Sequence, residues 1–170
     1  FQAKAVLSGS SWRVGGTSGV TDLDSQEIQY NAYGEISAKQ TNGGVGVNGD
    51  PQETFAYDKA GRLVKSNAGD GVTRFFYYDK SGNVTLTVNS AGADLSTYAT
   101  VDALTAALGS ITSPVTGMLL TLTTYNKRGD NLTTLTPHQY LPAAHPWSTT
   151  SRTFNAFGEA GMAWRPLADV

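Results

Sequence analysis

The sequence predicts a mainly β chain, built of consecutive antiparallel β-hairpins that form a curved sheet, with one short helix in an insertion. A seven-residue motif with the residue types of a tight turn occurs five times along the 170 residues. Stretches in which apolar and polar residues alternate flank these copies, as expected for half-buried strands. The composition, with 19 Gly, 10% aromatic and only 15% charged residues, suits turns and strands more than helices.

The motif consists of an aromatic residue, Asp or Asn, two variable residues, Gly, a polar residue and usually an aliphatic residue. Its copies are YNAYGEI (30–36), YDKAGRL (57–63), YDKSGNV (78–84), YNKRGDN (125–131) and FNAFGEA (154–160). We call its fixed places the aromatic, Asx, glycine and polar positions. The residues predicted to build the turns at the first three of these positions are Tyr30, Asn31, Gly34, Tyr57, Asp58, Gly61, Tyr78, Asp79, Gly82, Tyr125, Asn126, Gly129, Phe154, Asn155 and Gly158.

Each residue class has a mechanical role in such a turn. The aromatic ring ends the first strand and packs on a cross-strand neighbour, and Asp or Asn bends the chain by bonding the backbone two residues on. Gly takes the positive φ that a three- to five-residue hairpin loop needs. Because Asn replaces Asp58 and Asp79 in the other copies, the Asx position indicates a turn rather than an acid catalyst.

The motif copies divide the chain into four parts. Residues 1–26 are expected to form lead-in strands and a Gly-rich loop, and residues 91–118 an insertion between two sets of motif hairpins at 27–90 and 119–170. The expected strands cover residues 27–30, 35–40, 62–66, 72–78, 83–88, 119–125, 132–136 and 148–154, and the expected loops cover residues 41–52 and 137–147.

A short helix is predicted within the insertion, at residues 99–109. Thr100 can cap its start, Asp102 suits its first turn, and Gly109 can end it. The residues that share one face of this helix are Val101, Leu104, Ala107 and Leu108.

The motif copies resemble the YD repeats of the RHS-repeat family. YDKAGRL and YDKSGNV match the signature of these repeats closely, and YNAYGEI and FNAFGEA are similar to a common variant of it. The segment GRLVKSNAGDGVTRFFYYDKSGN (61–83) is similar to a whole repeat, including its central Gly turn. The resemblance covers roughly residues 27–90 and 119–160 and does not extend to the insertion.

The resemblance implies a section of a long spiralling β-sheet that closes into a hollow shell or barrel. Bacterial members of the family are large secreted or cell-surface proteins whose shell encloses a toxin polypeptide, and animal teneurins use a similar shell in cell adhesion. We therefore expect a secreted or surface-located shell section, whose partners are flanking repeats of the same polypeptide and an enclosed toxin. The alternative is an adhesion module that binds a carbohydrate or a cell-surface receptor.

The autoprotease segment that ends the shell of many bacterial members is not expected in this piece. That segment contains a DPxGL-like motif, whereas Asp50-Pro51 is followed here by Gln52-Glu53. We predict no catalytic residue, no cofactor and no metal site. The two histidines, His138 and His145, have no third ligand placed beside them by the sequence pattern.

Composition argues against several partners. The net charge of −2 gives no electrostatic basis for nucleic-acid binding, and no apolar run is long enough to span a membrane. The absence of Cys excludes thiolate chemistry in this chain. Phe75 and Tyr77 lie on one face of an expected strand and are candidates for stacking on a ligand, although packing between layers is the reading that the pattern favours.

Overall fold

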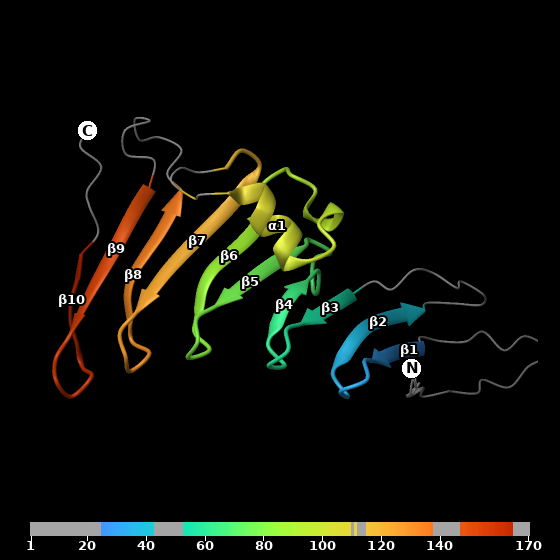
Figure 1. Ribbon diagram of the computed structural model, residues 1–170, viewed down its shortest axis with the longest axis horizontal. Helices are drawn as coiled ribbons and strands as arrows, with labels where there is room; N and C mark the ends of the chain where they lie inside the picture. The colour runs from blue at the N-terminus through green and yellow to red at the C-terminus, as the bar shows by residue number, and fades with distance from the viewer. Residues whose placement is uncertain (1–24, 43–52, 110, 112–114, 138–146, 165–170) are drawn as a thin grey trace, which may run out of the picture. The chain divides into compact units, whose positions relative to one another are not determined.

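A computed structural model of the protein describes residues 25–42, 53–109, 111, 115–137 and 147–164 (Figure 1). The chain divides into two compact units, Phe1–Val72 and Thr73–Val170, which are described separately below. The expected lead-in up to residue 24, and residues 43–52 of the loop expected at 41–52, lie outside the described residues. Thr41 and Asn42, expected in that loop, belong to a strand instead.

The first unit consists of four antiparallel strands. They are β1 (Ser25–Tyr30), β2 (Ile36–Asn42), β3 (Glu53–Tyr57) and β4 (Leu63–Ser66), and each strand pairs with the next one in the chain. Between β2 and β3, the Lys39 ammonium lies 3.8 Å from a Glu53 carboxylate oxygen and 5.4 Å from the centre of the Phe55 ring. These contacts link two hairpins that the motif turns themselves do not join.

The second unit continues the same pattern with six strands. They are β5 (Arg74–Tyr78), β6 (Val84–Ser90), β7 (Met118–Tyr125), β8 (Asn131–Pro137), β9 (Trp147–Phe154) and β10 (Ala160–Trp164). Each pairs antiparallel with its successor in the chain (Figure 1). Three motif turns therefore lie at one end of this sheet, and the connection from β6 to β7 leaves from the other end.

These elements confirm the predicted fold class: the described chain is mainly β and built of consecutive antiparallel hairpins, with an α-helix in the insertion. The sequence pattern did not predict β10, because its residues AGMAW show no alternation of apolar and polar side chains. Pro137 was expected in a loop, but it is the last residue of β8 and pairs with Trp147. Proline is tolerated at such a strand end because few ladder hydrogen bonds need its missing N–H.

The insertion contains a 3-10 turn, η1 (Leu95–Thr97), followed by α1 (Val101–Leu108). The helix starts as predicted, because the Thr100 hydroxyl oxygen accepts a hydrogen bond from the Ala103 N–H at 3.2 Å. It ends at Gly109, which has a φ of +57° and donates its N–H to the Thr105 carbonyl. Leu104 and Leu108 are buried, whereas Ala107, expected on the same face, is exposed.

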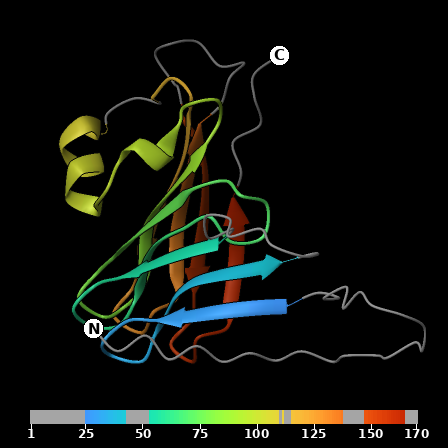
Figure 2. The ribbon, with the colours of Figure 1, turned by 90° about the vertical axis from the view of Figure 1, so that its right-hand side faces the viewer.

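The hydrophobic core of the second unit lies between this insertion and one face of strands β5, β6 and β7. Figure 2 shows the insertion on one side of the strands. Pleating sends alternate side chains of a strand to opposite faces, so the strands and the insertion each contribute one apolar face. The buried members of the cluster are Phe75, Leu86, Val88, Leu95, Leu104, Leu108 and Leu120. Among the described residues, no helix is both long and apolar enough to cross a membrane.

We expect Leu120→Ala to lower the free energy of unfolding by about 2–5 kcal/mol, because it removes a fully buried side chain and leaves a cavity. The adjacent Leu119 is a matched control, since it points to the other face of β7 and is 42% exposed. Leu119→Ala should lower the free energy of unfolding by less than about 1 kcal/mol. Chemical denaturation of the chain measures both values, and equal losses would contradict the one-sided core.

Candidate functional site

The motif copies form turns with the same set of hydrogen bonds. In each copy the backbone N–H of the Asx position donates to the carbonyl of the polar position at 2.8–3.0 Å, and the glycine N–H donates to the Asx carbonyl at 3.0–3.2 Å. The Asx Oδ1 atom accepts two further backbone N–H groups, from the residue two places on and from the polar position, at 2.8–3.0 Å. The five sequences therefore fold into one loop.

Glycine is required in this loop by its backbone conformation. The motif glycines have φ angles between +77° and +91°, a region that residues with a Cβ atom rarely adopt. A turn followed by such a residue produces the one-residue bulge that is common in three-residue hairpin loops. The hairpin registers show this bulge, because the aromatic residue pairs with the residue that follows the polar position, as Tyr57 pairs with Leu63.

The side chains at the Asx and polar positions form a complementary pair in every copy. Where the Asx position is Asn, its amide nitrogen donates to a carboxylate, as Asn31 does to Glu35 at 2.6 Å. Where it is Asp, its carboxylate accepts from a donor, as Asp58 does from Arg62 Nε at 2.7 Å. The remaining pairs follow the same rule: Asp79 with Asn83, Asn126 with Asp130 and Asn155 with Glu159, at 2.6–2.9 Å.

This pairing changes the acidity of the two aspartates. Hydrogen bonds from the Arg62 side chain and backbone, with its charge, hold the pKa of Asp58 below its usual range. Hydrogen bonds from the side chain and backbone of Asn83 lower the pKa of Asp79. Each carboxylate accepts hydrogen bonds within its own turn through both oxygens, so the geometry assigns both groups a role in holding the turn.

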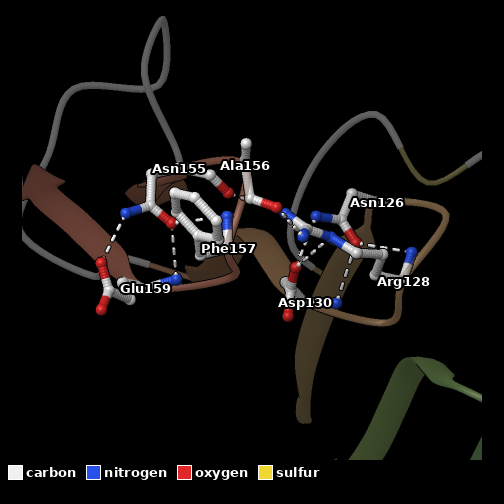
Figure 3. A network of polar contacts seen from close by, with 7 residues as sticks. All are labelled: Asn126, Arg128, Asp130, Asn155, Ala156, Phe157 and Glu159. Atoms are coloured by element: carbon white, nitrogen blue, oxygen red, sulfur yellow. Dashed lines mark hydrogen bonds and ion pairs between the residues drawn. The ribbon is translucent and has the colours of Figure 1, made fainter.

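Neighbouring turns also contact one another. In the second unit Arg128 reaches from its own turn to the next, and its two terminal nitrogens donate to the carbonyls of Asn155 and Ala156 at 2.8 and 2.7 Å (Figure 3). In the first unit a Cβ atom added at Gly61 would lie 2.9 Å from Oε1 of Glu35 in the preceding turn. Within each unit, neighbouring turns therefore lie side by side at one end of the sheet, and in the second unit Arg128 bonds one turn to the next.

Phe75 and Tyr77, the candidates for ligand stacking, both pack against the insertion. Phe75 is fully buried and is one of the largest side chains of the core, so it offers no surface to a ligand. The Tyr77 hydroxyl donates to the Val101 carbonyl at 3.4 Å and accepts from the Thr105 hydroxyl at 3.2 Å. Burial raises the pKa of Tyr77. Both rings pack between layers, which is the reading that the sequence pattern favoured.

The two most exposed aromatic side chains lie elsewhere and were not singled out by the sequence pattern. Tyr33 and Phe157 occupy the variable place just before the glycine position and are 90% and 89% exposed. The signal that could have found them is their shared context, because only these two copies read Asn-Ala-aromatic-Gly-Glu. A ring held at the tip of a rigid turn can contact a partner with little loss of conformational entropy.

Among the described residues, no group of three or more His, Asp or Glu side chains is arranged to hold a metal ion. His138 and His145 lie outside the described residues, as does Asp50-Pro51. No protein-family model matches the chain, and no curated protein matches it significantly. The likeness to YD repeats therefore depends on the motif residues described above.

The complementary pair predicts a coupled pair of substitutions. Asp58→Asn alone would set two donors against each other, and Arg62→Glu alone would set two carboxylates against each other, so each should destabilise the chain. Together they recreate the Asn–Glu pair of residues 31 and 35. Because the pair is partly exposed, we expect a favourable coupling of about 0.5–1 kcal/mol in a double-mutant cycle of chemical denaturation. Additive losses would show that the two side chains do not act as a pair.

The lowered pKa of Asp79 predicts a dependence of stability on pH. The folded chain binds the proton less well than the unfolded chain, whose Asp pKa is about 3.9. The stabilisation is therefore complete above that pH and is lost as the pH falls through the folded-state pKa. The variant Asp79→Asn should lose less stability than the wild type between about pH 6 and pH 2 in parallel denaturation experiments. Superimposable pH profiles of the two proteins would contradict this assignment.

Proposed function

We propose that this chain is a structural section of an RHS-type β-shell in a large secreted bacterial protein, and that the shell encloses a toxin polypeptide until release. The observation that carries the proposal is the row of equivalent turns. Each motif hairpin repeats the same loop, and within each unit each strand pairs with its successor. A sheet of this kind grows by adding hairpins, without a new type of contact at each step.

Containment follows from the physical character of such a sheet. Neighbouring strands are joined by ladder hydrogen bonds, and a sheet of this kind presents its main rows of unpaired backbone groups at its two edges. Closure by flanking repeats of the same polypeptide would remove those edges. In this proposal the motif residues build the wall and perform no chemistry, and the enclosed polypeptide carries the activity.

Protease treatment of the full-length polypeptide that contains this chain tests the proposal. We expect a cargo polypeptide to survive digestion while the protein is folded, because a closed wall excludes the protease. The same polypeptide should be digested completely after the protein is unfolded. If digestion of the folded protein removes every segment outside the hairpins, the chain does not belong to a container.

A second candidate function is an adhesion module that binds a carbohydrate or a cell-surface receptor. The exposed rings of Tyr33 and Phe157 favour it, since a rigid exposed aromatic residue is typical of a binding hot spot. Glycan-array binding by the chain that is lost in the Phe157→Ala variant would support this function. Retained binding in that variant would show that the exposed ring of Phe157 has no role in adhesion.

A further inference from the structure

Neighbouring motif hairpins within a unit meet in the same register. The junctions between them are the strand pairs β2–β3, β6–β7 and β8–β9. Continuing each of these ladders by three residues toward the turns brings the aromatic position of one copy opposite the polar position of the copy before it. The facing residues are Tyr57 and Glu35, Tyr125 and Asn83, and Phe154 and Asp130. Because the connection from β6 to β7 contains the whole insertion, this common register does not depend on the length of the connection.

Where the aromatic position is tyrosine, the residue faces the turn before it. At the β6–β7 junction the Tyr125 hydroxyl donates to the Val84 carbonyl at 2.9 Å, and Val84 directly follows the polar position of the preceding copy. At the β2–β3 junction burial raises the pKa of Tyr57, and the negative charge of Glu35 raises it further. The second effect requires the Tyr57 hydroxyl to lie near the carboxylate of the preceding turn.

At the β8–β9 junction the aromatic position is Phe154, which has no hydroxyl group. There the contact comes from the preceding turn, where the Arg128 guanidinium donates to the carbonyls of Asn155 and Ala156 at 2.8 and 2.7 Å (Figure 3). Asp130 restrains the guanidinium through an ion pair, with its Oδ2 atom 3.5 Å from Arg128 Nε. Two donors from one planar group fix the position of the next turn more closely than one donor would.

The β8–β9 ladder itself discriminates poorly between registers. Thr134 lies opposite Thr150, and Thr136 lies opposite Ser148. A slip by two residues keeps each side chain on its own face and again sets hydroxyl groups opposite hydroxyl groups, for example Thr134 opposite Ser148. Trp147 packs on the core at the far end of the ladder, away from the turns. The end of this junction near the turns therefore needs a contact outside the ladder to fix its register.

We propose that Arg128 determines the register in which the β9–β10 hairpin joins β8, and that the tyrosine hydroxyl does the same at a junction where the aromatic position carries one. The contact between turns, and not the connecting segment, then determines which residues of neighbouring hairpins face each other. This proposal concerns how hairpins recognise one another. It holds equally for a sheet that encloses a cargo and for one that binds a receptor.

The absence of Cys allows pairs of introduced cysteines to report the register. Thr134→Cys with Thr150→Cys reports the observed register, because these residues lie directly opposite each other. Thr134→Cys with Ser148→Cys reports a slip by two residues. In the observed register that second pair is diagonal, about 7–8 Å apart, and a disulfide needs Cα atoms within about 7 Å. Glutathione disulfide serves as the oxidant, and circular dichroism checks that each variant is folded.

Each cysteine pair is combined with Arg128→Ala and, as a matched control, with Lys127→Ala, which removes an exposed positive charge from the same turn. We expect Arg128→Ala to raise the rate of the slipped disulfide relative to the observed one at least about fivefold, because two hydrogen bonds that oppose the slip are lost. Lys127→Ala should leave this ratio unchanged. A ratio that does not change in Arg128→Ala, or that rises equally in Lys127→Ala, would overturn the inference.

A rescue experiment tests the equivalence of the two contacts. Phe154→Tyr adds the hydroxyl group that Tyr125 carries at the preceding junction, and the equivalent acceptor is the carbonyl of Asn131, the residue that follows the polar position. In the Arg128→Ala chain this substitution should return the disulfide ratio to within about twofold of its original value. Phe154→Leu, which adds no hydroxyl group, should not. If Phe154→Tyr fails to restore the ratio, the hydroxyl and the guanidinium do not perform the same role.

Discussion

The hydrogen-bonded pair between the Asx and polar positions is the interaction on which the hairpins depend. The Asx Oδ1 atom accepts the backbone N–H groups that shape the turn. The second terminal atom of the same side chain, Oδ2 or Nδ2, bonds the side chain at the polar position, so one residue holds both the backbone and the side chains of the loop. The pair works with either polarity, as an amide donating to a carboxylate or as a carboxylate receiving a donor. The loop geometry is therefore kept while its charge varies from copy to copy.

Much of the fold could be predicted because turns and caps are local. The motif glycines require only that the chain adopt a positive φ, and Thr100 and Gly109 mark the limits of α1 through contacts within a few residues. What could not be predicted depends on distant partners. The strand β10 exists because β9 is beside it, and Ala107 is exposed because the helix rests on the sheet through Leu104 and Leu108.

In the candidate site, too, features set by local contacts could be predicted, and features set by distant partners could not. The sequence indicated which residues build the turns, and it could not show that the Asx and polar positions are complementary until their atoms were placed. It also could not show which face of β5 the insertion would cover, because alternation gives two faces without saying which one is buried. For that reason Phe75 was a candidate for ligand binding, although it is a central residue of the core.

The contact made by Arg128 has a consequence for how such a chain changes over time. Its guanidinium bonds main-chain carbonyls of the next hairpin and ignores the side chains there. Every hairpin of this type presents those carbonyls, whatever residues occupy its variable places. The side chains of a hairpin placed beside Arg128 can therefore be exchanged without loss of these two hydrogen bonds.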